Sequence, residues 1–181
     1  MSQEYSKNRK SLDEGEMPEM RIVCYPDPEL RRRAEKVTEF DDELRRLAEG
    51  MAEIMHGLRG VGLAAPQVGS SMRLIVVNLG EERRHLVVVN PVVESLGGEA
   101  VGEEGCLSVP GVLGKVSRAE SVGVSGLGLD EKEIELEVEG LAARVFQHET
   151  DHLDGTLFID KLTPASRIAA EARLREMRRE G

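Results

Sequence analysis

The chain has 181 residues, which is enough for one domain with a hydrophobic core. Hydrophobic residues make up 40% of the sequence and charged residues 32%, a balance typical of globular proteins. The net charge of −10, from 34 acidic and 24 basic residues, argues against direct binding of nucleic acid, because the protein would repel the phosphate backbone. Tryptophan is absent and aromatic residues are few, so no stacking platform for bases is expected either.

The sequence contains no stretch close to the ~18 consecutive apolar residues of a membrane span. The first 20 residues are polar and lack the apolar centre of a signal peptide. We therefore expect no membrane association and a cytoplasmic location. The chain has two cysteines, Cys24 and Cys106, and a cytosolic chain of this size does not need to join them in a disulfide.

The N-terminal part divides into an extension and a helix. Residues 1–18 are polar and charged without a hydrophobic period, and we expect a disordered extension. Apolar residues at helical spacing then predict a helix from Asp41 to Leu58, with Asp41 or Asp42 as its N-cap.

The middle of the chain is predicted to be rich in strands. Residues 73–79 and 85–89 are short runs of Val, Ile and Leu separated by a charged turn. Residues 116–124 and 132–138 alternate apolar and polar side chains, which predicts two further strands.

Two more helices are predicted to close the chain. The first covers about residues 141–153, and the second starts at Thr163-Pro164, an N-cap followed by proline at the first helical position. Because strands cluster before these helices without regular alternation, we expect an α+β fold with mostly antiparallel sheet. The predicted parts are the extension 1–18, a catalytic body of residues 19–163 and a C-terminal helix of residues 164–181.

The segment His148-Glu149-Thr150-Asp151-His152 has the form H-E-x-x-H. On a helix, positions i and i+4 share one face, so both imidazoles can bind one metal ion, and Glu149 can accept a proton from water beside it. A chance match on a surface helix is the alternative. However, burying two histidines beside acidic residues is costly unless a ligand offsets their desolvation. His56 and His85 have no such neighbours, and we expect them to be surface or structural residues.

Two histidines leave a catalytic tetrahedral site one protein ligand short. An extended motif would place a third histidine where Phe158 stands, so that option fails. Glu171 on the last predicted helix would give a thermolysin-type peptidase. Cys106 is the other candidate, because glycine and charged residues before it suit an exposed approach to a metal. Cys24, which follows Ile22-Val23, is the better candidate for packing in the core. A purely structural site is disfavoured, because such sites are normally closed by four protein ligands.

Three segments resemble the motifs of the peptide deformylase family. Residues 60–67 (GVGLAAPQ) resemble G-x-G-L-A-A-P-Q, residues 104–108 match E-G-C-L-S, and residues 147–152 (QHETDH) match Q-H-E-x-D-H, in the family's order. The resemblance covers about residues 20–163. It implies antiparallel sheets around the helix that carries the two histidines. It also implies hydrolysis of the N-terminal formyl group of N-formylmethionyl nascent polypeptides, with release of formate.

The resemblance also implies a role for the matched residues. The metal ligands are Cys106, His148 and His152, and Glu149 is the general base that later protonates the leaving amine. The side chain of Gln67 and the backbone N–H of Leu107 then stabilise the negative charge that develops on the formyl oxygen.

The family binds its peptide as an added strand, and we expect Val61, Gly62 and Gly105 to lie along it. Leu141 and Val145, two turns and one turn before the metal ligands, are candidates for the pocket of the methionine side chain.

Further charged residues have candidate supporting roles. Glu104, Arg118 and Asp151 are candidates to hold the ligands in place, although for Arg118 and Asp151 a structural ion pair is the simpler interpretation. Arg144 could line the methionine pocket or pair with an acid, and the sequence leaves both options open.

A thiolate with two imidazoles suits Zn²⁺, Fe²⁺, Co²⁺ or Ni²⁺. The resemblance implies one divalent ion per chain, Fe²⁺ natively, with Zn²⁺, Ni²⁺ or Co²⁺ as substitutes. The arginine-rich C-terminal helix is most simply a solvated surface. Docking on the ribosome, as in bacterial relatives, is the alternative.

Overall fold

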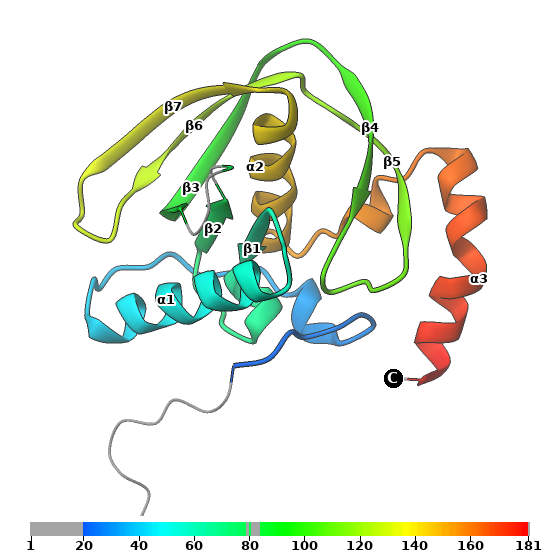
Figure 1. The fold of residues 1–181 in the computed structure, drawn as a ribbon, viewed down its shortest axis with the longest axis horizontal. Helices are drawn as coiled ribbons and strands as arrows, with labels where there is room; N and C mark the ends of the chain where they lie inside the picture. The colour runs from blue at the N-terminus through cyan, green and yellow to red at the C-terminus, as the bar shows by residue number, and fades with distance from the viewer. Residues whose placement is uncertain (1–19, 79, 81–83, 181) are drawn as a thin grey trace, which may run out of the picture.

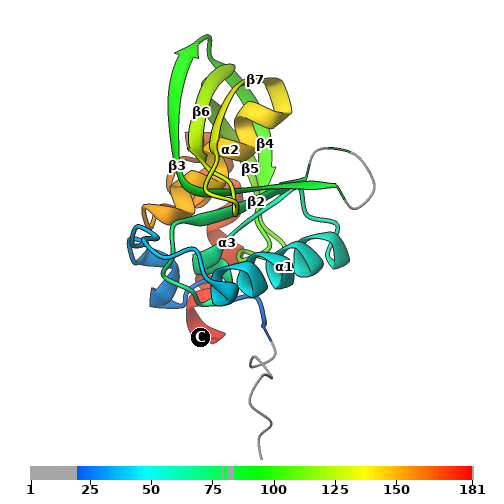
Figure 2. The same cartoon turned by 90° about the vertical axis from the view of Figure 1, so that its left-hand side faces the viewer.

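The structure is a computed structural model, and it describes residues 20–78, 80 and 84–180 (Figures 1 and 2). The predicted disordered extension, residues 1–18, lies outside the described residues. The fold is α+β, as predicted, with two antiparallel sheets and three α-helices in the described ranges. None of these helices is long and apolar enough to cross a membrane.

The larger sheet has five strands in the order β1-β2-β3-β6-β7, and the smaller sheet pairs β4 with β5. Every pairing between these strands is antiparallel. The strand bounds are β1 Gly62–Ala64, β2 Leu74–Asn78, β3 His85–Gly97, β4 Ala100–Gly105, β5 Leu113–Arg118, β6 Ser121–Leu127 and β7 Glu133–Glu139.

Three helices pack against these sheets. They are α1 (Asp42–Gly57), α2 (Gly140–Leu153) and α3 (Pro164–Glu180), and short 3₁₀ turns cover Pro28–Arg31, Ala65–Val68 and Phe158–Asp160. Figure 1 shows α2 between the β3-β6-β7 part of the larger sheet and the β4-β5 pair, with α1 below and α3 on the outer side of β5. The fold therefore places the predicted metal-binding helix at its centre.

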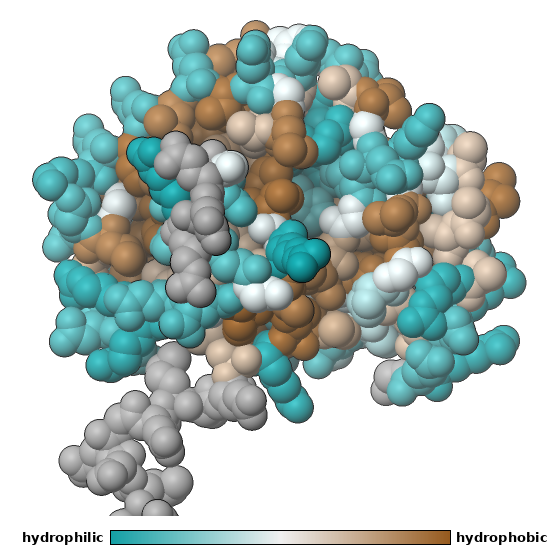
Figure 3. Space-filling model, viewed as in Figure 1, coloured by the Kyte–Doolittle hydropathy of each residue, from teal (hydrophilic) through white to brown (hydrophobic). Residues whose placement is uncertain are grey.

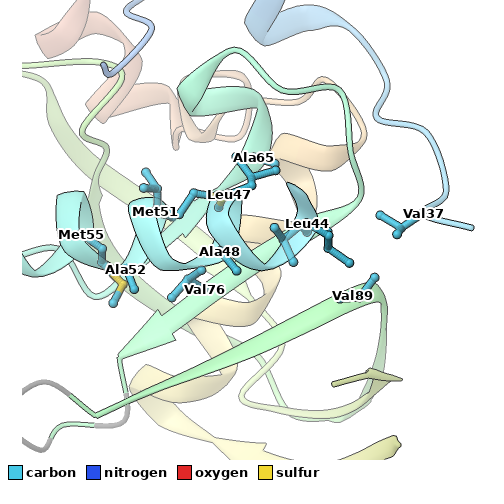
Figure 4. Packing of buried hydrophobic residues seen from close by; sticks show 12 residues of the cluster. Val37, Leu44, Leu47, Ala48, Met51, Ala52, Met55, Ala65, Val76 and Val89 are labelled. Carbon is cyan, nitrogen blue, oxygen red and sulfur yellow. The ribbon is translucent and has the colours of Figure 1, made fainter. Parts of the chain in front are cut away.

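The helix α1 forms where the sequence predicts it. Asp41 is its N-cap, because its side chain accepts a hydrogen bond from the Leu44 N–H at 2.9 Å. Figure 4 shows the apolar side of α1 packed against Val76 of β2 and Val89 of β3. The buried residues that α1 contributes are Leu44, Leu47, Ala48, Met51, Ala52 and Met55.

One predicted strand is wrong. Residues 116–124 form two strands, because β5 ends at Arg118 and β6 begins at Ser121 in the other sheet. The side chain of Gln147 holds the corner between them. Its Oε1 accepts from the Ala119 N–H, and its Nε2 donates to the Ala119 carbonyl, both at 3.0 Å. The alternation of apolar and polar residues continues through this corner, so it could not reveal the change of sheet.

The strand β3 is longer than the predicted run 85–89. It continues to Gly97 through Asn90, which has φ 52° and lies where the pairing register with β6 shifts. The Asn90 side chain bonds both the N–H and the carbonyl of Val37 at 2.9 Å, which stabilises this irregular point. Figure 2 shows that β3 bends from the part beside β2 towards β6. The strands β1 and β4 were not predicted, because both are short and contain glycine.

The helix α3 packs on β5 and on the segment that precedes α3 in the chain. Its Ala170, Leu174 and Met177 join a core cluster with Val116 and Leu162. The division of the chain into a catalytic body and a separate C-terminal segment stays a prediction.

Candidate active site

The helix α2 presents both histidines of the H-E-x-x-H segment on its buried side. His148 and His152 are buried, and their ring centroids lie 5.1 Å apart. Cys106 follows β4, and its Sγ lies 3.3 Å from His152 Nε2. One ligand atom from each of Cys106, His148 and His152 lies within 4.8 Å of the others. Metal bonds of about 2.0–2.3 Å can span such distances, so this set fits one divalent ion.

The two alternative positions for a third ligand, residues 158 and 171, do not belong to this group. Phe158, at the position of the third histidine in the extended motif, stacks on the His148 ring with centroids 5.9 Å apart. Glu171 lies on α3, where it pairs with Arg175 and Arg178. In the described part of the chain, the only group of this kind that could hold a metal contains Cys106.

Glu104 holds His148 from the side away from Cys106. Its Oε2 lies 2.9 Å from His148 Nδ1, which leaves Nε2 of that ring to face the metal position. Arg118 donates to both carboxylate oxygens of Glu104, each at 2.9 Å. Burial opposes the charge of Glu104, but the hydrogen bonds from Arg118 and His148 outweigh it and hold the pKa of this carboxyl well below its usual range. Glu104 is therefore a permanent anion beside His148.

The two imidazoles have opposite electrostatic surroundings. Burial opposes a charge on His148, but its hydrogen bonds with Cys106 and Glu104 raise its pKa to about 10. Burial and the nearby positive charges of His148 and Arg118 lower the pKa of His152. Because a metal ligand must be neutral, binding of a cation here releases the His148 proton.

Among the described residues, the hydrogen-bond partners of the Asp151 carboxylate are two basic side chains. It accepts hydrogen bonds from Arg118 and from Lys161 Nζ, the latter at 2.6 Å. Its link to the histidines runs through Arg118 and Glu104.

Glu149 is a buried carboxylate at the pocket that Cys106 and His148 also line. Only 4% of the residue is exposed, and its Oε2 has no hydrogen-bond partner among the described residues. Burial is the main reason that its pKa rises to about 7. A Cβ at Gly62 would overlap with the Glu149 carboxylate, so the glycine lets β1 approach the acid. A carboxyl group with a pKa near neutrality is suited to accepting and returning a proton.

Gln67 is 2% exposed, so it is a buried residue and not an ordinary surface glutamine. Its Oε1 accepts from the Ala64 N–H at 2.8 Å, which fixes the amide orientation. Its Nε2 therefore faces the site, 3.3 Å from Cys106 Sγ and 3.2 Å from Ser108 Oγ. The backbone N–H of Leu107 has no backbone acceptor in the described ranges. Both groups are donors beside the metal position.

A pocket of about 510 Å³ leads to these groups. Figure 3 shows apolar side chains gathered in the centre of this face, between the larger sheet and the β4-β5 pair. Leu141 is 68% exposed at the pocket, whereas Val145 is buried. The predicted substrate-contacting residues all line it: Val61, Gly62, Gly105, Leu141 and Val145.

Arg144 does both things that the sequence left open. It lines the pocket, and its Nη1 donates to Glu104 Oε1 at 2.7 Å. Two functional candidates were missed. Ser108, the last residue of the matched segment 104–108, bonds Gln67, and Phe158 stacks on His148. Their place in the family motif or in the H-E-x-x-H continuation is the signal that could have found them.

The remaining histidines and the second cysteine lie elsewhere. His56 Nε2 and His85 Nδ1 are 3.4 Å apart, between α1 and β3. Cys24 is exposed, so its predicted packing in the core is wrong. Although Ile22 and Val23 pack partly in the core, Cys24 directly precedes the turn at residues 25–26, and it is exposed.

Comparisons with known proteins agree with this geometry. Residues 19–167 match the family model described as polypeptide deformylase. A peptide deformylase of Halothermothrix orenii is 49% identical over 146 residues, which cover 81% of this chain and 95% of the relative. A crystallised peptide deformylase of Plasmodium falciparum superimposes with a TM-score of 0.84 at 42% identity, covering 88% of this chain and 96% of that one. A structure from Legionella pneumophila gives a TM-score of 0.81 at 45% identity, covering 88% of this chain and 95% of that one. The chain therefore belongs to the polypeptide deformylase family.

Proposed function

We propose how the described residues carry out the reaction of this family, the hydrolysis of the N-terminal formyl group from N-formylmethionyl nascent polypeptides. The observation that carries the proposal is the buried Glu149 carboxylate beside the Cys106, His148 and His152 donors at the pocket, whose Oε2 has no partner among the described residues. A structural metal site needs no such acid. A general base must lie within reach of the proton that it removes.

We infer that Cys106, His148 and His152 bind the divalent ion. Fe²⁺ is the proposed native ion, supported by the motif resemblance, and Zn²⁺, Ni²⁺ or Co²⁺ can replace it because they accept the same thiolate and imidazole ligands. When bound, the ion supplies Lewis acidity, which polarises the formyl carbonyl and makes water more acidic. Anaerobic iron and zinc forms should differ in rate, and equal rates would contradict the choice of Fe²⁺.

Glu149 moves the proton in both halves of the reaction. Its carboxylate takes a proton from the water that attacks the formyl carbon. The same group then gives the proton to the leaving amine, and formate departs. In the metal-free site burial raises its pKa to about 7, and a carboxyl group of this kind can both accept and return a proton.

Gln67 Nε2 and the Leu107 N–H stabilise the formyl oxygen as it gains negative charge. Neither donor has to reorient during the reaction, because the Ala64 N–H fixes the Gln67 amide and Leu107 follows Cys106 in the chain. Removal of one such donor typically lowers the rate ~100–1000-fold.

The substrate peptide is proposed to lie along β1 and the end of β4, beside Val61, Gly62 and Gly105. Its methionine side chain then meets Leu141 and Val145 on α2. We place the protein in the cytoplasm, where nascent chains are made.

Ribosome docking through α3 is the less favoured part of the proposal. Arginines on α3 pair with acids of the same helix, for example Arg173 with Glu176 at 2.6 Å and Arg175 with Glu171 at 2.8 Å, which supports a solvated surface. Deletion of α3 would also remove core residues. Charge reversal of the exposed Arg175 and Arg179, followed by ribosome co-sedimentation, is therefore the cleaner test.

The test of the whole proposal is formate release from a formyl-Met-Ala-Ser peptide by anaerobic protein loaded with Fe²⁺ or Ni²⁺. Glu149→Gln keeps the shape of the side chain but cannot act as a base, and we expect it to lower the rate ~100–10,000-fold while metal stays bound. Release by the wild type and its loss in the variant would support the reaction and the role of Glu149 together. No release from folded, metal-loaded wild type would overturn the proposal.

A further inference from the structure

Arg144 of α2 is a partly buried cation held by three acceptors of the β4-β5 pair. Its Nη2 donates to the Ala100 carbonyl at 2.7 Å, and its Nη1 donates to the Val116 carbonyl at 3.0 Å and to Glu104 Oε1 at 2.7 Å. Only 12% of its side chain is exposed. These hydrogen bonds fix the orientation of the guanidinium, and they connect α2 to both strands of the smaller sheet.

Gly102 of β4 provides the space for this guanidinium. A Cβ at Gly102 would lie 2.9 Å from both Cζ and Nη2 of Arg144 and 3.0 Å from its Nε. Gly102 lies in a paired strand opposite Val116, and its φ is outside the left-handed region that requires glycine. The backbone therefore does not need a glycine here, whereas the bound Arg144 side chain does.

Arg144 completes the set of donors around Glu104. Oε1 of Glu104 accepts from Arg118 Nε and Arg144 Nη1, and Oε2 accepts from Arg118 Nη2 and lies 2.9 Å from His148 Nδ1. A carboxylate has about four acceptor sites, so each is used. Loss of the Arg144 bond removes one of the two donors on Oε1, so Glu104 is held by Arg118 alone and orients the His148 ring less firmly.

We propose that Arg144, seated on Gly102, is a positioning residue that acts on His148 through Glu104. This inference rests on the proposed function, because His148 is a metal ligand only there. Arg144 also lines the pocket beside Val145 and His148, so one side chain joins the pocket wall to the support of the metal site.

The test compares Gly102→Ala, Arg144→Met and Arg144→Lys with the wild type. Gly123→Ala is the matched control, because Gly123 also lies in a strand, and its Cβ would meet Leu96 at an ordinary 3.7 Å. The first readout is the rate at which Ni²⁺-loaded protein loses its ion to a chelator, which requires no substrate. We expect ~10-fold faster loss in Gly102→Ala and Arg144→Met, a smaller increase in Arg144→Lys, and no change in Gly123→Ala.

The second readout separates kcat from KM for formate release. Arg144→Met replaces the apolar stem of the arginine at the pocket but removes its guanidinium. We therefore expect KM to change less than about 2-fold, whereas kcat falls ~10-fold. The double variant Gly102→Ala/Arg144→Met should lose metal no faster than Arg144→Met alone, because the added methyl group then meets only a flexible side chain. Thermal unfolding shows whether each variant folds. If Arg144→Met fails to fold, Gly102→Ala and Arg144→Lys carry the test.

Metal loss at the wild-type rate in folded Gly102→Ala and Arg144→Met would overturn the inference, as would additive effects in the double variant. These outcomes differ from failure of the proposed function. That failure would appear in the wild type itself, as absence of formate release with metal retained.

Discussion

The helices α1 and α2 both pack against the larger sheet, but their buried sides differ in kind. The buried side of α1 consists of Leu, Met and Ala side chains (Figure 4). The buried side of α2 combines Ala143, Phe146 and Leu153 with His148, Glu149 and His152. Both helices show the spacing of an amphipathic helix. In α1 burial stabilises the fold, whereas in α2 part of the buried side is given to ionisable groups that stability alone does not explain.

The buried ionisable groups of α2 are stabilised by residues from the smaller sheet. Glu104 and Arg118 compensate the charge and hydrogen bonding of His148, while the Glu149 carboxylate remains without a partner at Oε2 among the described residues. The comparison therefore separates residues that hold the protein together from residues that carry its chemistry. Substitutions on α1 should affect the free energy of unfolding, and those on α2 should affect metal binding and rate.

The largest effect is expected for His152→Ala. Loss of one proposed ligand should reduce bound metal to a small fraction of one ion per chain and lower formate release by more than ~1000-fold, because the ion supplies several kcal/mol of transition-state stabilisation. Metal analysis and formate assays measure both effects. Circular dichroism should show that the helices remain. Retention of metal by the variant would break the distinction between the two helices.

The opposite result is expected for Met51→Ala on α1. Met51 is fully buried in the cluster of α1 with the larger sheet, and its truncation should lower the free energy of unfolding by about 2–5 kcal/mol. Urea denaturation measures this change. Under native conditions the variant should still bind one metal ion and release formate at close to the wild-type rate. A large loss of kcat would show that α1 also carries part of the chemistry.

Glu104→Gln tests the support that the smaller sheet gives to α2. The substitution keeps the shape of the side chain but removes the charge and turns one acceptor oxygen into a donor facing other donors. We expect metal affinity to fall about 10–100-fold. Competition with a chromogenic chelator measures it. Unchanged affinity would mean that His148 needs no oriented carboxylate.

The smallest effect concerns the pH dependence of stability in metal-free protein. The folded-state pKa of Glu149 is raised to about 7, so the folded state binds a proton that the unfolded state has already released. Stability relative to Glu149→Gln is therefore present at low pH and lost as pH rises through about 7. Between pH 5.5 and 8.5 the wild type should lose about 2 kcal/mol relative to the variant. Denaturant titrations at both pH values measure the difference. Parallel curves would show that burial of Glu149 has no energetic cost.

Much of this arrangement could be predicted from local sequence patterns. The spacing of apolar residues predicts α1, and the H-E-x-x-H segment predicts a helix with two histidines on one side, because both patterns depend on neighbours within a few residues. The separation of β5 from β6 could not be predicted, because the choice of sheet at Ala119 depends on Gln147, which is 28 positions away. The extension of β3 past Asn90 depends in the same way on Val37.

The site shows the same contrast between local sequence patterns and contacts that only the folded chain brings together. The motif resemblance pointed to Cys106 with His148 and His152, and the structure brings the three together. The sequence left Arg144 undecided between wall and ion pair, because its three acceptors come from β4 and β5 and only the folded sheet brings them to one place. Cys24 was misplaced because its apolar neighbours Ile22 and Val23 do not determine the direction of its own side chain.

The most direct test of the account is the visible absorption spectrum of the Co²⁺-loaded protein, measured for the wild type, Cys106→Ser and Glu171→Ala. A thiolate ligand gives a charge-transfer band to cobalt, whereas a site of two histidines and a glutamate does not. We predict one cobalt per chain with this band in the wild type and in Glu171→Ala, and loss of the band in Cys106→Ser. Absence of the band from the wild type, or loss of cobalt from Glu171→Ala with retention in Cys106→Ser, would contradict a metal site built from Cys106, His148 and His152.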